Sequence, residues 1–185
     1  MSSVNWKWKV LHPMITDLIR FVVSFFVLLL IQVTVLNNIH LGGYINPFIY
    51  VMFILMLPVR IPGPLLLLLA FILGLVIDMF TNSVGMHAAA CVFMAFARPT
   101  VLKFIAPRDG YETESAPSVR EFGFNWFVIY ASILVFLHHL MLFYIEVFRI
   151  SEFFPTLLRI ILSTIFTTAI VVLVQFLTDK PKQSK

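Results

Sequence analysis

Long stretches of this sequence contain no Asp, Glu, Lys or Arg. These runs cover residues 21–59, 61–77, 79–97, 122–145 and 160–178. A helix needs about 20 apolar residues to cross a bilayer, so the first run is long enough for two crossings. Only 12% of the residues are charged, against roughly 25% in soluble domains. The sequence therefore predicts an all-α, polytopic integral membrane protein with six transmembrane helices in a compact bundle.

Asn, Gly and Pro residues divide these runs into spans, because they favour turns and end helices. They gather in the turn at 37–47, in the RIPGP sequence at 60–64 and in the short turn at 81–85. The predicted spans cover residues 18–36, 45–59, 65–80, 86–103, 122–148 and 155–177.

Three polar segments lie outside these spans. Residues 1–17 carry Trp6 and Trp8 among basic residues, which indicates an interfacial tail or a disordered one. Residues 106–121 form the one long hydrophilic loop and are expected to be solvated and mobile. Residues 178–185 form a basic tail.

Lys and Arg concentrate on one side of the predicted bundle. Six crossings place the N-terminal tail, the turn at residue 60, the 106–121 loop and the C-terminal tail together, whereas the opposite side carries Arg149 and Arg159. Basic residues accumulate in cytoplasmic segments, so both termini are predicted to be cytoplasmic. This bias and the anionic headgroups of membrane lipids account for the net charge of +4, so no nucleic-acid partner is needed to explain it.

Small residues and one carboxylate mark the centre of the sequence. Gly74 and Asp78 are four residues apart and share a helix face. After Gly85, the next helix carries small residues at Ala88 and Ala95, with the lone Cys91 expected to be a further packing residue. Small residues let membrane helices approach closely, so these two helices are predicted to cross tightly.

Asp78 has two readings. A carboxylate at this depth is costly and faces protein or water. It either caps or braces the turn at 81–85 by accepting backbone N–H bonds, or it contacts a ligand or partner directly.

A second polar group involves Asn82, His87, His138, His139 and Glu146. His139 and Glu146 are seven residues apart and share a face, but the adjacent histidines point about 100° apart. No H-E-x-x-H sequence is present. We expect interfacial or helix-to-helix hydrogen bonds here, with His87 at the outer interface and with no metal and no cofactor. A metal site or a proton relay is the alternative.

Arg98 and Pro99 lie near the end of the fourth span. Their position predicts an arginine that reaches for the membrane surface and a helix kink.

Signatures of catalysis are missing from the sequence. There is no G-x-S-x-G, P-loop or G-x-G-x-x-G pattern. The protein is therefore expected not to be an enzyme. An intramembrane hydrolase would require a second catalytic group within hydrogen-bond reach of Asp78.

The pattern G-x-x-x-D-x-x-x-x-x-x-G-x-x-A, at Gly74, Asp78, Gly85 and Ala88, resembles the rod shape-determining protein MreD family. The resemblance implies a non-catalytic component of the bacterial inner membrane. It also implies work with the bitopic MreC, with peptidoglycan-building enzymes and, indirectly, with the MreB filament. Its implied fold is similar to the substrate-binding subunits of energy-coupling-factor transporters.

That kinship suggests an alternative function, the substrate-binding subunit of a small-solute transporter. Such a subunit would need a polar pocket near the outer face, lined by Asp78, Asn82, His87 and residues of the fifth span.

Overall fold

The computed structural model describes residues 3–38, 44–111, 115–148 and 152–178, with residues 3–18 described by their backbone alone. Within these ranges the protein is all-α, with no strands. Its elements are α1 (Ser3–Thr34), a 3-10 turn η1 (Leu36–Asn38), α2 (Val51–Met56), α3 (Gly63–Thr81), α4 (Met86–Phe104), α5 (Val119–Phe122), α6 (Phe124–Val147) and α7 (Phe153–Thr178).

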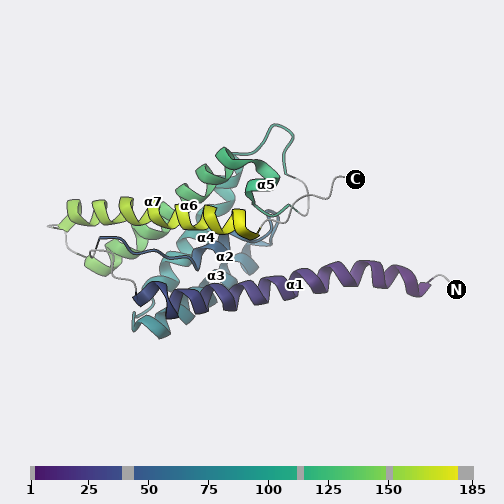
Figure 1. The fold of residues 1–185 in the computed structure, drawn as a ribbon, viewed down its shortest axis with the longest axis horizontal. Coiled ribbons are helices and arrows are strands. Elements are labelled where there is room, and N and C mark those ends of the chain that lie inside the picture. Colours follow the sequence, from purple (N-terminus) through teal and green to yellow (C-terminus); the bar gives the residue numbers. More distant parts are fainter. Residues whose placement is uncertain (1–2, 39–43, 112–114, 149–151, 179–185) are drawn as a thin grey trace.

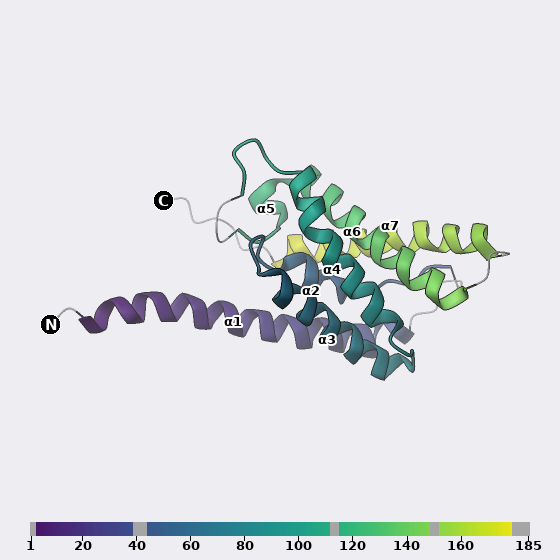
Figure 2. The same cartoon turned by 180° about the vertical axis from the view of Figure 1, so that it is seen from behind.

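The long helices pack in chain order. Figure 1 shows α3 against α4, α4 against α6, and α6 against α7, with the short α2 among them. Helix α1 lies along α3, and its N-terminal half extends beyond the bundle in both Figure 1 and Figure 2. The loop after α4 and the end of α7 lie at one end of the bundle, which we call the loop end. The α3–α4 turn and the start of α7 lie at the other, the turn end.

Four helical stretches in the described residues are long and apolar enough to cross a membrane. They are Ile19–Asn38, Gly63–Thr81, Phe124–Val147 and Phe153–Thr178. The expectation of a multi-pass helical membrane protein is thereby confirmed at this level. Helix α4 falls outside this set; it has 19 residues but carries His87, Arg98 and Lys103.

The span predicted for residues 45–59 is not a continuous helix. Only Val51–Met56 is helical, and residues 44–50 run through the bundle as irregular backbone. Backbone N–H groups inside a membrane need internal partners, and side chains of α1 and α7 supply them here. The bonds are Asn46 N to Ser163 Oγ (3.0 Å), Phe48 N to Thr167 Oγ1 (3.2 Å) and Ile49 N to Gln32 Oε1 (2.8 Å).

Two other boundaries differ from those expected. Helix α1 begins at Ser3 and not near residue 18, so residues 3–17 continue the first span as helix. The loop at 106–121 is partly docked on the bundle, because Ser115 O accepts a bond from Val59 N (2.9 Å) and Ser118 caps α5. The bounds of α3, α4, α6 and α7 lie within two residues of the expected spans. The predicted tail at 178–185 lies outside the described residues, apart from Thr178 at the end of α7.

Candidate functional site

The carboxylate of Asp78, on α3, caps the N-terminus of α4. Asp78 Oδ1 accepts hydrogen bonds from His87 N (3.0 Å) and Ser83 Oγ (2.6 Å), and Oδ2 accepts one from Ala88 N (2.9 Å). The first N–H groups of a helix have no partner within the helix, and an anion near them is favourable. Asp78 is only 4% exposed, and both carboxylate oxygens are occupied. These are the contacts of a cap.

The turn between α3 and α4 explains how Asp78 reaches this position. Asn82 ends α3 in the left-handed conformation, at φ 53°, and Gly85 precedes α4 at φ 76°. Ser83 N donates to the backbone O of Asp78 at 3.2 Å. The side chain of Asn82 is exposed, so Asn82 does not join the polar interior as expected.

Gly74 lies where α3 and α4 cross. A Cβ atom at Gly74 would stand 2.6 Å from both Ala88 N and His87 O, and nearer still to the Ala88 Cα. Only glycine fits at this distance from another backbone. Cys91 and Ala95 are completely buried further along α4. The small residues therefore place the backbone N–H groups of α4 beside Asp78.

Ser83, His87 and Asp78 are the residue types of a hydrolytic triad, and they lie within reach of one another. Ser83 Oγ is 2.9 Å from His87 Nδ1, and Asp78 Oδ1 is 3.1 Å from that same nitrogen. In a catalytic triad the serine and the aspartate bond to opposite ring nitrogens, so that the imidazole can carry a proton between them. Sharing one nitrogen does not provide that path.

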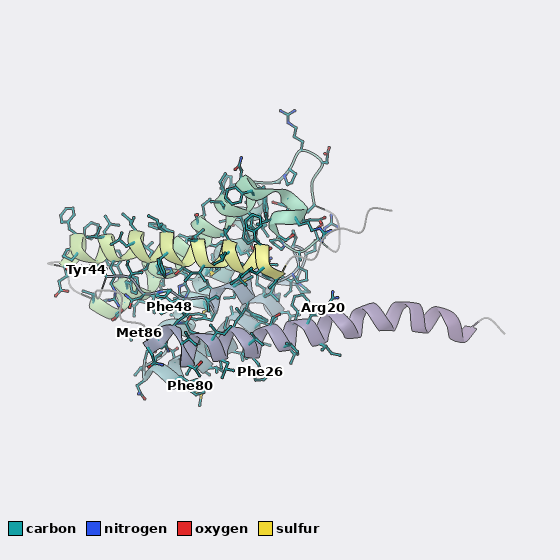
Figure 3. The ribbon with its side chains drawn as sticks, in the orientation of Figure 1. Arg20, Phe26, Tyr44, Phe48, Phe80 and Met86 are labelled. Carbon is teal, nitrogen blue, oxygen red and sulfur yellow. The ribbon has the colours of Figure 1, made fainter. Side chains whose placement is uncertain are left out.

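Three histidine rings lie near the ring of Phe48, which belongs to the irregular segment and is labelled between α7 and α1 in Figure 3. We call them the histidine cluster. The ring centroids of His87, His138 and His139 lie 5.6, 5.9 and 5.4 Å from that of Phe48. Tyr50 Oη lies 2.9 Å from His138 Nε2. The structure therefore brings together three of the five residues expected to form a polar group.

His139 and His138 differ in how their nitrogens are paired. His139 Nδ1 lies 2.7 Å from Val135 O, and its Nε2 lies 3.4 Å from Thr167 Oγ1. His138 Nδ1 is buried and has no hydrogen-bond partner among the described residues. Within those residues, no group of three or more His, Cys, Asp and Glu side chains could hold a metal ion.

Glu146, the last of the residues expected in the polar group, pairs with a basic residue of α7. Glu146 Oε2 forms an ion pair with Arg159 Nη1 at 3.1 Å, and the Arg159 guanidinium lies 4.1 Å from the ring centroid of Phe143.

Replacing Glu146 with Gln is expected to have little effect. The two side chains are 41% and 23% exposed, and pairs of this kind contribute roughly 1 kcal/mol or less. The thermal unfolding midpoint of Glu146→Gln in detergent should stay close to that of the native protein. A large loss of stability in Glu146→Gln would contradict the description of Glu146 as an exposed partner.

Arg98 is the interior residue that sequence reasoning placed wrongly. It is completely buried and does not reach for the membrane surface. Its Nε donates to Tyr130 Oη (2.7 Å), its Nη1 to Pro58 O (3.3 Å) and its Nη2 to Leu57 O. Tyr130 Oη in turn donates to Leu55 O at 3.0 Å. We call this set of contacts the Arg98 clamp, because it holds the carbonyl groups at the end of α2.

Sequence reasoning also missed the side chains that hold the irregular segment. Gln32 donates from Nε2 to Pro47 O (3.1 Å) and accepts from Ile49 N. Ser163 and Thr167 lie four residues apart on one face of α7, next to Thr164 and Thr168. The repeated spacing of hydroxyl side chains in this apolar helix is the sequence feature from which these contacts could have been predicted.

No protein-family model matches this sequence, and no significant match was found among curated proteins or solved structures. The role proposed for the site therefore rests on the geometry of its residues.

Proposed function

We propose that this protein is a non-catalytic scaffold of the bacterial cell-elongation machinery in the inner membrane. It binds an MreC-like bitopic protein and supports peptidoglycan synthesis along the cell cylinder. The observation that carries the proposal is that Asp78, within the MreD-like pattern, is fully occupied as the cap of α4. Gly74 makes that contact possible by its closeness to Ala88. The pattern then serves to fix a helix pair.

The faces available to a partner are apolar. In the Ile19–Asn38 stretch only 17% of the most apolar window is buried within the protein, the lowest share of the four candidate spans. Val22, Phe26 and Leu30 are exposed there, as are Leu68 and Leu75 on the neighbouring α3. Van der Waals packing drives association of membrane helices. The exposed apolar side chains of α1 and of the adjacent α3 form a surface suited to bind the single transmembrane helix of a bitopic protein. Lipid covers the remaining surface.

The proposed topology has six crossings, with both termini cytoplasmic. The irregular segment with α2 forms one crossing and α4 forms another, alongside the four long apolar helices. The basic residues of the cytoplasmic side then face anionic lipid headgroups. Peptidoglycan-building enzymes would join through the complex, and an MreB-like filament would be reached indirectly from that side.

A small-solute binding subunit is the second candidate, and two atoms favour it. His138 Nδ1 and Asn46 Nδ2 are buried without partners among the described residues, beside irregular backbone. Irregular backbone inside a membrane bundle often lines a binding site. Of the residues expected to line its pocket, Asn82 is exposed, and the Asp78 oxygens accept hydrogen bonds from Ser83, His87 and Ala88.

Substitutions at the helix crossing test the scaffold proposal. Gly74→Leu forces α3 and α4 apart, and Asp78→Leu removes the cap of α4. Both changes displace the apolar face that would contact the partner. Recovery of the MreC-like protein with the tagged variant should fall by about tenfold, which corresponds to about 1.4 kcal/mol of binding free energy.

Gly63→Leu is the matched control, because a side chain at Gly63 would meet nothing within 4 Å. Recovery is compared at equal amounts of folded, membrane-inserted protein. If Gly74→Leu and Asp78→Leu recover as much partner as the Gly63→Leu control, the scaffold proposal is wrong.

A further inference from the structure

The segment from residue 44 to residue 59, which we call the α2 strut, connects the histidine cluster with the Arg98 clamp. Tyr44 at its start is exposed, and residues 49–55 are buried. Tyr50, Val51, Ile54 and Leu55 are completely buried in it. Its helical part has six residues and rises about 9 Å. The strut therefore joins the two polar parts of the interior by a short, stiff and enclosed connection.

At the turn end the strut is held by side-chain hydrogen bonds to its backbone. Gln32 of α1 and Ser163 and Thr167 of α7 take the N–H groups of residues 49, 46 and 48. Ser163 Oγ also donates to Tyr44 O at 3.4 Å. These bonds are directional, so they define one position of the backbone relative to α1 and α7.

At the loop end the strut is held by its carbonyl groups and by the loop that follows α4. Arg98 and Tyr130 bind the carbonyl oxygens of residues 55, 57 and 58. Val59 N donates to Ser115 O at 2.9 Å, and Arg60 Nη2 donates to Tyr111 O at 3.2 Å. A shift of residues 57–59 would therefore break or move the bonds that dock the loop.

The loop is also tied to the clamp through stacked aromatic rings. The ring of Trp126 stacks on that of Tyr130, with centroids 5.1 Å apart and planes at 17°. The ring centroid of Phe122 lies 4.4 Å from that of Trp126, and the ring centroid of Tyr111 lies 5.3 Å from that of Phe122. Trp126 Nε1 donates to Ile105 O at 2.8 Å. The clamp and the docked loop thus form one packed unit.

The middle of the strut is held differently. The side chains of Val51, Phe53, Ile54 and Leu55 are apolar and belong to the main core cluster. Gln175 Nε2 adds a contact to the weakly accepting Met56 Sδ, at 2.9 Å. Apolar packing is not directional, so a small shift along the helix axis costs less here than at the two ends.

We propose that the α2 strut couples the two ends of the bundle. When the bonds to Gln32, Ser163 and Thr167 at the turn end are made, residues 57–59 are held in the position that docks the loop. When they open, the loop is released. Coupling between two sites is reciprocal, so opening the Arg98 clamp also loosens residues 46–49. The proposal concerns the bundle itself and holds whichever partner the protein binds.

Hydrogen exchange of the full-length protein in lipid nanodiscs tests this coupling. Thr167→Val keeps the shape of the side chain but removes the acceptor for Phe48 N. Exchange of the backbone amides of residues 46, 48 and 49 should become about fivefold faster, as expected for loss of one hydrogen bond. Exchange should also become faster at residues 57, 59 and 60 of the loop end and at residues 115, 116 and 118 of the docked loop. In the reverse direction, Tyr130→Phe should make exchange faster at residues 46, 48 and 49.

Thr164→Val is the matched control, because it makes the same substitution one residue from Ser163 on α7, and Thr164 Oγ1 has no hydrogen-bond partner among the described residues. It should change exchange at neither end. The coupling proposal is overturned if Thr167→Val affects residues 46–49 alone, if Thr164→Val has the same effect, or if exchange rises evenly along α6 and α7. Should Thr167→Val not fold, Ser163→Ala opens the same end by a smaller change and is judged by the same outcomes.

Discussion

A single methyl group at position 74 is expected to destabilise this protein severely. The Cβ of Gly74→Ala would stand 2.6 Å from Ala88 N and His87 O, which are backbone atoms and cannot rotate away. Helices α3 and α4 must therefore move apart, and the bonds from Asp78 to α4 lengthen with them. We expect a loss of about 3 kcal/mol, at the upper end of the usual cost of overpacking. The thermal unfolding midpoint in mild detergent measures it.

Gly63→Ala is the control for this prediction. It makes the same change near the start of the same helix, where a Cβ meets nothing within 4 Å. Its midpoint should equal or exceed that of the native protein, because alanine favours the helix more than glycine does. Equal midpoints for Gly74→Ala and Gly63→Ala would show that α3 and α4 do not cross as closely as described.

Arg98→Leu is expected to have a comparably large effect. Without the guanidinium, the carbonyl groups of Leu57 and Pro58 lose a donor inside an apolar core, and Tyr130 Oη loses its bond to Arg98 Nε. Each buried polar group left unpaired costs about 1–3 kcal/mol, so the total is expected to be several kcal/mol. Reversible unfolding in mixed detergent micelles, followed by tryptophan fluorescence, measures the change.

Arg108→Leu provides the comparison for Arg98→Leu. Arg108 lies exposed in the loop after α4, so the same loss of charge should alter the unfolding free energy little. Arg98→Lys should fall between the two, because an ammonium group can reach a carbonyl but cannot copy the planar guanidinium. Native stability in Arg98→Leu would mean that this side chain reaches the membrane surface, as its position in the sequence suggested.

The sequence was sufficient for the elements that local patterns determine. Runs without charged residues predicted an all-α membrane protein, and Pro, Gly and Asn residues predicted the bounds of α3 and α4 within two residues. It failed at residues 45–59, where an apolar run was read as a continuous helix. The irregular backbone there is satisfied by Gln32, Ser163 and Thr167, and the two hydroxyls belong to a helix more than a hundred residues away in the chain.

In the candidate site too, contacts between residues near in the sequence were predicted and contacts between distant residues were missed. The spacing of Gly74, Asp78 and Ala88 predicted a close helix pair, because all three lie near one turn of the chain. The Arg98 clamp could not be foreseen, since its carbonyl partners lie 40 and 41 residues away. Arg98 also occupies a position near a helix end that is typical of arginines reaching for the membrane surface. Glu146 was grouped with His139 by helical spacing, but its partner Arg159 belongs to another helix.

The most direct test of the central claim is affinity purification of the tagged native protein from bacterial membranes in mild detergent, with mass spectrometry of the proteins that accompany it. The scaffold account predicts recovery of an MreC-like bitopic protein together with peptidoglycan-building enzymes. Recovery of a coupling ATPase module in their place would contradict that account and indicate the substrate-binding subunit of a small-solute transporter.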